Sequence, residues 1–224
     1  MIRLSRGGEM GKTKLRSAVP GDSRRIAYLS YLAGRGHARM SAYDLIFPGH
    51  PVGPTPKRLD EMASVLTTDT RSWFHFSRHA VVDVEGRAVA TLCAFPRKEG
   101  NAGPLFMAFR EVGWTKERID LMRKEMRSFT STEIDIPLDS WVIEDVGCYE
   151  EYRRRGFVKA LLESSVEAGR ESGLRNARLS VFIGNEPAIK AYENFGFVIT
   201  GEKRHPDFEA VFGCPGTYQM TLKM

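Results

Sequence analysis

The sequence predicts a mixed α/β fold, and three stretches carry this prediction. "HAVVDVEGRAVATLCAF" (79–95) reads as a hairpin, because two runs rich in Val and Ala flank a turn at 85–87. "SWVIEDVGCY", "FVKALLESSVEAGRESG" and "ARLSVFI" (140–183) read as strand, helix and strand. Their short connections require a parallel, right-handed crossover. "FVITGEKR" (197–204) and "TYQMTLK" (217–223) then close the chain as two strands.

The N-terminal half begins with a strand and a helix. "TKLRSA" (13–18) is a predicted short strand, and "PGDS" supplies a turn in which Asp22 or Ser23 can act as N-cap. Apolar residues then recur at helical spacing as far as Gly34. The next stretch is rich in Gly and Pro, and we expect one more short helix near 59–66.

Segment 97–139 is less regular and contains one predicted helix, about 115–129, because Ile119, Met122 and Met126 form a single apolar stripe. It therefore reads as a helical insert between the hairpin and the crossover.

A last helix follows the crossover. In "NEPAIKAYENFG" (185–196), Asn185 is the predicted N-cap and Gly196 ends the helix. We expect a loop between the final two strands. It contains three residues that either line a pocket or are ordinary loop residues: His205, Asp207 and Phe208.

Composition indicates a globular protein. The chain has 224 residues, 42% of them hydrophobic and 27% charged, which excludes a largely disordered or fibrous protein. No apolar run approaches the roughly 18–20 residues of a membrane-spanning helix, and the start lacks the apolar segment of a secretory signal. We therefore expect a cytoplasmic protein without membrane association. It would have a flexible tail, residues 1–11, and a single domain, residues 12–224.

The cysteine content and the net charge limit the kinds of ligand and partner that can be expected. Cys93, Cys148 and Cys214 are far apart and form no CxxC pair, so reduced thiols are expected. His75 and His79 are four residues apart, but the sequence there is strand-like, so no metal site is predicted. The net charge of +5 favours anionic partners, either nucleic acid or a phosphate-bearing small molecule.

The most informative stretch is "YRRRGF". Arg153, Arg154, Arg155 and Gly156 lie where the crossover helix is predicted to begin, and a helix N-terminus with free N–H groups attracts anions. A glycine there lets a phosphate approach the backbone. The alternative is a solvated basic face or a nucleic-acid patch. No aromatic residues interleave with the arginines, which makes nucleic acid the weaker partner. GxGxxG and GxxxxGK[ST] are absent, so nucleotide folds built on them lose support.

Two motifs together resemble the GNAT superfamily of N-acetyltransferases. Its R/Q-x-x-G-x-G/A motif corresponds to 153–158, and its Asn plus "AxxxYExxGF" signature corresponds to 185–197. The resemblance implies the acetyltransferase fold: a mostly antiparallel sheet with a central parallel βαβ crossover and helices on both faces. It places the acetyl-CoA-binding core at 141–198 and makes segments 34–58 and 97–139 the acceptor side. The family prefers Gly or Ala at Val158, so that residue is expected to weaken or displace the cofactor.

The resemblance also assigns roles in a reaction that needs acetyl-CoA and no metal. The cofactor-binding residues would be Val146, Gly147, Cys148, Arg153, Arg154, Arg155, Gly156, Phe157, Val158 and Asn185. The backbone N–H of Val146 would serve as oxyanion donor, and Tyr192 would protonate the departing thiolate. In its other reading, Tyr192 is a core residue on the apolar stripe of its helix.

An alkylamine must lose a proton before it attacks, and Glu144 is the predicted base. Regular strand alternation would put Glu144 among Val142, Val146 and Cys148, where burial raises a carboxyl pKa. "IEDV" further resembles polyamine-acetylating members of the superfamily, which implies that Asp145 binds the cationic acceptor. In the alternative, Glu144 merely pairs with a neighbouring arginine.

The sequence therefore predicts an N-acetyltransferase that acts on a primary amine of a small molecule or a peptide. A homodimer is the assembly considered for it. The alternatives are a protein lysine or N-terminal acetyltransferase, and a non-catalytic acyl-CoA-binding sensor domain. A basic nucleic-acid-binding module is a third, weaker alternative.

Overall fold

A seven-stranded sheet runs through residues 13–224, the part of the chain that the computed structural model describes. The strands are β1 (Thr13–Ser17), β2 (His79–Val84), β3 (Arg87–Pro96), β4 (Ser140–Cys148), β5 (Asn176–Phe182), β6 (Val198–Arg204) and β7 (Gly216–Lys223). Their order across the sheet is β1-β2-β3-β4-β5-β7-β6. Among these pairs only β4 and β5 run parallel.

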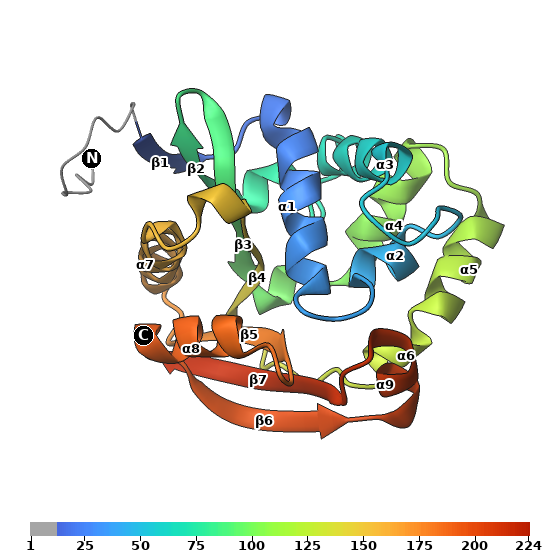
Figure 1. The fold of residues 1–224 in the computed structure, drawn as a ribbon. Coiled ribbons are helices and arrows are strands. Elements are labelled where there is room, and N and C mark those ends of the chain that lie inside the picture. Colours follow the sequence, from blue (N-terminus) through green and yellow to red (C-terminus); the bar gives the residue numbers. More distant parts are fainter. Residues whose placement is uncertain (1–12) are drawn as a thin grey trace.

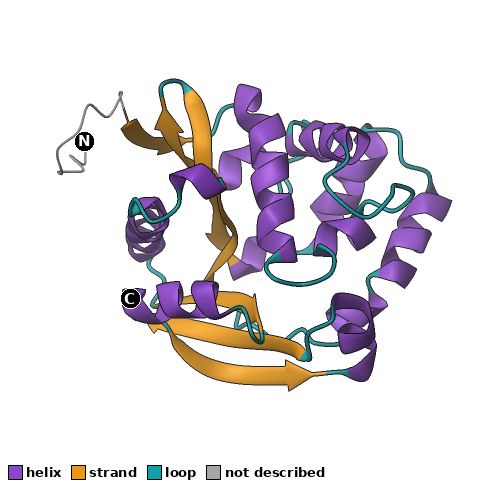
Figure 2. Ribbon diagram, in the orientation of Figure 1, coloured by secondary structure: helices purple, strands orange, loops and turns teal. Residues whose placement is uncertain are grey.

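Helices cover both faces of the sheet (Figure 2). They are α1 (Ser23–Arg35), α2 (Ala42–Ile46), α3 (Pro56–Leu66), α4 (Ala102–Glu111), α5 (Lys116–Glu125), α6 (Arg127–Thr130), α7 (Phe157–Glu171), α8 (Glu186–Phe195) and α9 (Pro206–Phe212). Helix α7 packs on β2, β3 and β4 from one side, and α1 packs on β3 and β4 from the other (Figure 1). Helices α2 to α5 lie beyond α1 (Figure 1).

Each face has its own apolar core. On the α7 side, Ile143, Leu161, Leu179 and Met220 are almost fully buried in one cluster that also includes residues of α8. On the α1 side, the cluster joins α1 to α3, α4 and α5 through residues such as Ile26, Met62, Phe109 and Ile119. Burial of these side chains supplies most of the driving force that holds the helices on the sheet.

The predicted fold class is confirmed: a mixed sheet, mostly antiparallel, with one parallel crossover and helices on both faces. Several local expectations were wrong. Helix α2 was not predicted within the stretch rich in Gly and Pro. Helix α4 was not predicted, although Leu105, Ala108 and Phe109 follow helical spacing behind the N-cap Asn101. The helix expected over 115–129 breaks at Met126, between α5 and α6.

The expected loop between β6 and β7 contains α9 instead. His205 caps this helix by accepting the backbone N–H of Asp207 (3.2 Å), and Phe208 is fully buried. Phe208 is therefore part of the packed core, whereas Asp207 remains exposed. The tail predicted for residues 1–11 lies outside the described residues. Within those residues, no helix has the length and apolar character needed to cross a membrane.

Candidate active site

Strands β4 and β5 form a fork. Their pairing joins Ser140 to Asn176 and ends where Val142 meets Arg178. Beyond that point β4 continues to Cys148, while β5, β7 and β6 turn away from the first four strands (Figure 1). In the described part of the chain, β4 has no other strand neighbour on this side. Its outer main chain is thus an unpaired strand edge inside the protein, able to bind an extended polar chain.

A β-bulge lies in the open part of β4. Cys93 of β3 pairs with Glu144 and Thr91 with Gly147, so β4 holds one residue more than β3 over this interval. Asp145 takes up the extra length in a left-handed conformation, with φ of 52°.

The bulge changes which face each side chain occupies. Val142 packs with Cys93 and Phe95 on the α1 side, whereas Val146 and Cys148 pack on the α7 core. The expectation that Val142, Glu144, Val146 and Cys148 share one face is therefore wrong, because it required unbroken alternation. The bulge is what brings two consecutive residues, Glu144 and Asp145, to the fork.

The two carboxyls at the bulge have different environments. Burial, reinforced by the charges of Asp145 and Glu133, raises the pKa of Glu144 to about 8, and Arg97 opposes the shift. Burial also raises the pKa of Asp145, to about 6, against a hydrogen bond from Tyr43 (2.6 Å). No described residue forms a hydrogen bond or ion pair with the Glu144 carboxylate, so the arginine-paired alternative finds no support. Such separation of two pKa values is typical of acid–base sites.

Gly147 lets α1 approach β4 closely. A Cβ atom at Gly147 would lie 2.5 Å from the carbonyl oxygen of Leu29, closer than real Cβ contacts occur. This predicted cofactor residue therefore has a packing role as well. Its neighbour Cys148 donates its thiol to the Tyr149 carbonyl (3.4 Å), and burial raises the thiol's pKa to about 11. A protonated thiol is a weak nucleophile at neutral pH.

The arginine-rich loop presents free backbone N–H groups. Arg154 (φ of 61°) and Gly156 (φ of 80°) are both left-handed, an arrangement that favours an anion-binding concavity. The first backbone hydrogen bond of α7 runs from Ala160 to Gly156 (3.0 Å), and no side chain caps the helix. The N–H groups of Phe157 and Val158 thus belong to an uncapped helix N-terminus. No described atom lies within 4 Å of a Cβ at Gly156, so backbone conformation is what requires glycine there.

The three arginine side chains are exposed around this N-terminus. Arg155 donates to the Glu151 carbonyl (3.0 Å), and its guanidinium lies 5.1 Å from the centre of the Tyr152 ring. The backbone N–H of Arg153 donates to the Glu150 carbonyl (3.1 Å), but the guanidinium groups of Arg153 and Arg154 form no hydrogen bond or ion pair with the described residues. Two cations therefore stand free beside the uncapped helix.

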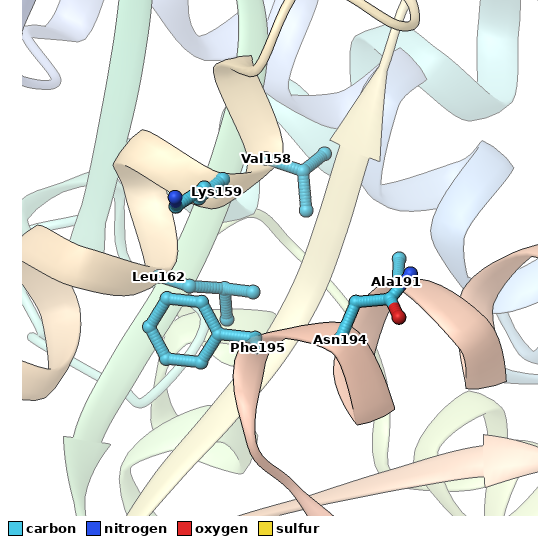
Figure 3. Close-up of a pocket in the computed structure, with 6 residues that line it drawn as sticks. All are labelled: Val158, Lys159, Leu162, Ala191, Asn194 and Phe195. Carbon is cyan, nitrogen blue, oxygen red and sulfur yellow. The ribbon is translucent and has the colours of Figure 1, made fainter.

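A pocket of about 360 Å³ lies between α7 and α8, next to this loop (Figure 3). Helix α7 supplies Val158, Lys159 and Leu162, and α8 supplies the remaining lining residues: Ala191, Asn194 and Phe195. Val158 is thus part of the pocket wall, and the lining is mostly apolar.

Asn185 occupies the N-cap position of α8, but its side chain makes no capping hydrogen bond, contrary to expectation. Its amide nitrogen lies 2.8 Å from where a Cβ on Gly36 would stand, so it packs against the connection after α1.

Tyr192 is buried against Phe197, with ring centres 6.0 Å apart, and burial raises its pKa. Among the described residues, no group forms a hydrogen bond with its hydroxyl, which leaves that donor available.

Sequence reasoning missed several residues of this region. Tyr43 contacts Asp145, and Glu133 and Arg97 act on Glu144, yet none belongs to a motif. Lys159 lines the pocket from the first turn of α7. Its place directly after the 153–158 motif was a signal from which the sequence could have identified it. His75 and His79 lie in different elements: His75 bonds Ser77 in a 3₁₀ turn, and His79 starts β2.

Comparison with known proteins agrees with this architecture. The sequence pattern of the Acetyltransferase (GNAT) family matches residues 41–197, well over half of the chain. This chain belongs to the GNAT family. It is 40% identical over 65 residues to the uncharacterized N-acetyltransferase YycN of Bacillus subtilis (strain 168). That match covers 29% of this chain and 42% of the relative, less than half of the relative's length.

Solved structures share the fold over almost the whole chain. An N-acetyltransferase from Staphylococcus aureus Mu50 superposes with a TM-score of 0.66 at 19% identity, over 93% of this GNAT chain and 100% of the other. An agmatine N-acetyltransferase mutant superposes with a TM-score of 0.55 at 15% identity, over 95% and 98%. At these identities the likeness establishes the fold alone and confirms the predicted fold class. The predicted family is confirmed by the family model that matches residues 41–197.

Proposed function

We propose that this GNAT protein is an acetyl-CoA-dependent N-acetyltransferase, which transfers acetyl directly to a primary amine of a small molecule or a peptide. One observation carries the proposal. The unpaired edge of β4, the two carboxyls at its bulge and the uncapped N-terminus of α7 follow one another within residues 142–158. An extended ligand with amides at one end and phosphates at the other fits this order of binding groups.

The residues present fit acetyl-CoA. The main chain of Val146, Gly147 and Cys148 would pair with the amides of the pantetheine arm, and the free amide of Asn185 would contact it. The pyrophosphate would be held by the loop and first turn of α7: Arg153, Arg154, Arg155, Gly156, Phe157 and Val158. The apolar pocket beyond Val158 would receive the adenosine end, with the Lys159 ammonium close by. When bound, acetyl-CoA supplies the thioester that is attacked.

The chain's own residues then move protons and stabilise charge. Glu144 takes a proton from the acceptor ammonium, directly or through a water, and its raised pKa suits a base at neutral to alkaline pH. Asp145 attracts the ammonium group. The N–H of Val146 donates to the carbonyl oxygen as it gains negative charge. Tyr192, whose hydroxyl has no described partner, gives its proton to the departing sulfur.

The acceptor is proposed to be a cationic amine. Glu144 and Asp145 meet at the fork, and Glu133 adds a further negative charge to the surroundings of Glu144. The agmatine enzyme of the same fold acts on a small amine of this kind. The same fork could receive a lysine side chain or an N-terminal amine of a protein.

Thiol release from acetyl-CoA in the presence of an amine panel tests the proposal. Butylamine, 1,4-diaminobutane and a lysine-containing peptide distinguish small-molecule from peptide acceptors. Protection by CoA against thermal unfolding reports cofactor binding separately. Thiol release that requires an amine supports an enzyme, and a rate at least about tenfold lower in Tyr192→Phe supports the proposed acid. Thermal protection by CoA without thiol release, unchanged in Glu144→Gln and Tyr192→Phe, would instead identify a sensor domain.

A further inference from the structure

The Asp145 carboxylate is held by a side chain from a distant part of the sequence. The hydroxyl of Tyr43 in α2 donates to Asp145 Oδ2 at 2.6 Å, although the two residues are 102 positions apart. Asp145 is also the left-handed residue of the bulge, so its backbone is held in a conformation that residues with a Cβ rarely adopt. Main chain and side chain together therefore give this carboxylate one orientation.

Tyr43 has little freedom to move. Its side chain is 4% exposed, and its ring centre lies 5.4 Å from that of Phe74 and 6.3 Å from that of Phe47. A Cβ atom at Gly34 would come within 3.0 Å of the ring, so α1 also presses against it. Burial, together with the neighbouring Asp145, raises the pKa of Tyr43 well above its ordinary value. The hydroxyl therefore remains a donor at any working pH.

The short helix that carries Tyr43 is itself fixed by a buried ionic network. Asp44 accepts hydrogen bonds from the Ser41 N–H (2.8 Å) and the Tyr31 hydroxyl (2.7 Å), and pairs with Arg58 at 2.7 Å. Arg58 is completely buried and also donates to the Pro51 carbonyl (2.7 Å). Removing a partner from such a network is costly, so α2 has a single position relative to α1 and α3.

The described groups around the Asp145 carboxylate include no cation, so the Tyr43 hydroxyl is important for keeping Asp145 ionised. Asp145 is faced by Tyr43 from α2, by Cys93 from β3 and by Glu144 from its own strand, with Ser30 of α1 beside it. Around Glu144 there are in addition Glu133 and Arg97. The groups in contact with Asp145 are thus acidic or uncharged, and Tyr43 is a neutral donor that favours its ionised form.

We propose that Tyr43 is a positioning residue for the acceptor: it fixes the ionised Asp145 carboxylate as the counter-ion for the ammonium group of an alkylamine. The inference rests on the proposed function and deepens it. Tyr43 donates to Oδ2, and Ser30 also favours the ionised carboxylate, so the remaining lone pairs of Asp145 are those proposed to accept from the ammonium. Recognition of the acceptor then depends on α2, which belongs to the proposed acceptor side. Binding of acetyl-CoA does not depend on α2.

Tyr43→Phe tests the inference because it removes the donor and keeps the ring. Tyr31→Phe is the matched control: it also removes a tyrosine hydroxyl from an aspartate (Asp44, 2.7 Å), and it reaches Asp145 only through α2, which the Arg58 ion pair and the Ser41 N–H still hold. Titration of ¹³C-labelled aspartate carboxyls by NMR, with the Asp145 signal assigned through Asp145→Asn, measures the coupling without any enzymatic assay. We expect the pKa of Asp145 to rise by about one unit in Tyr43→Phe and to stay unchanged in Tyr31→Phe.

Acetyl transfer gives the second readout, with 1,4-diaminobutane as probe. In Tyr43→Phe the KM for this amine should rise about tenfold, as expected when a hydrogen bond to a charged group is lost. The KM for acetyl-CoA should stay within about twofold, because its proposed site does not include α2. Asp145→Asn should raise the KM for the amine as well, and combining the two changes should add little.

The outcomes separate the two proposals. An unchanged Asp145 titration in Tyr43→Phe, or an equal shift in Tyr31→Phe, overturns the positioning role whether or not the protein is active. Equal increases in both KM values overturn it too, because they indicate general distortion. If the wild type transfers no acetyl group to any amine, the proposed function fails, and the titration still decides whether Tyr43 controls Asp145.

Discussion

The two sides of the fork are built in different ways. The proposed cofactor side consists mainly of main-chain groups from one contiguous stretch: the open edge of β4, the left-handed loop and the uncapped start of α7. The proposed acceptor side consists of side chains from separate segments, with Tyr43, Glu133 and Arg97 acting on the carboxyls of β4. A backbone site can be encoded by a local motif, whereas converging side chains require the complete fold.

This contrast explains why the proposed cofactor side could be predicted from the sequence. A glycine or arginine at a helix start has its effect through local conformation and charge, so its neighbours in sequence are also its neighbours in space. Tyr43 has its effect through a hydrogen bond to a residue 102 positions away. We therefore expect substitutions on the two sides to affect different measured quantities.

Glu144→Gln should have the largest effect. Loss of the base should lower the rate of acetyl transfer about 10²- to 10⁴-fold while CoA binding is kept. Because a base works only when deprotonated and the pKa of Glu144 is about 8, the wild-type rate should rise with pH through that value. A pH–rate profile of thiol release checks both points. An unchanged rate in the variant would remove Glu144 from the mechanism.

Gly147→Ala should break the contact that joins the two sides. Its Cβ would meet the Leu29 carbonyl oxygen at 2.5 Å, and such overpacking costs about 1–3 kcal/mol of unfolding free energy. Denaturant unfolding measures this loss. The matched control is Gly156→Ala, where no described atom lies within 4 Å and only the left-handed backbone opposes the change. The control should lower CoA affinity more than it lowers stability. The opposite ranking would contradict the assignment of these two glycines.

Glu144 should also make the free protein less stable as pH rises. Its pKa is raised from 4.5 to about 8 on folding, so the unfolded chain releases the proton first. The contribution of Glu144 to the free energy of unfolding is fully present below about pH 4.5 and declines as the pH rises towards 8. Glu144→Gln should therefore raise the Tm at pH 8 and have little effect near pH 4.5. A Tm difference that does not change with pH would show that the folded-state pKa is not raised.

Val158→Ala should have the smallest effect. Its side chain forms part of the wall of the α7–α8 pocket. The motif that residues 153–158 resemble has Gly or Ala at this position. Shortening it should tighten CoA binding about two- to fivefold by relieving crowding, a gain within the usual range for a single side chain. Isothermal titration with CoA measures it. Weaker binding would mean that Val158 contributes favourable contact area.

Much of the fold could be predicted because its signals are local. The hairpin at β2–β3, the crossover from β4 to β5 and α8 follow from residue spacing and turn chemistry, and the structure has them within a few residues. Helix α9 was missed because Phe208 is recognisable as a core residue only when α6 and β5 are known to pack around it.

By itself, the sequence determined the crossover, the arginine-rich helix start and the presence of two adjacent carboxyl groups before them. These are properties of neighbouring residues, set by backbone preferences and charge. Only the tertiary structure decided that β4 separates from β5, that a bulge places Val142 and Val146 on opposite faces, and that Tyr43 holds Asp145. These depend on packing between segments far apart in the chain, where the position of each side chain is settled by the elements that surround it.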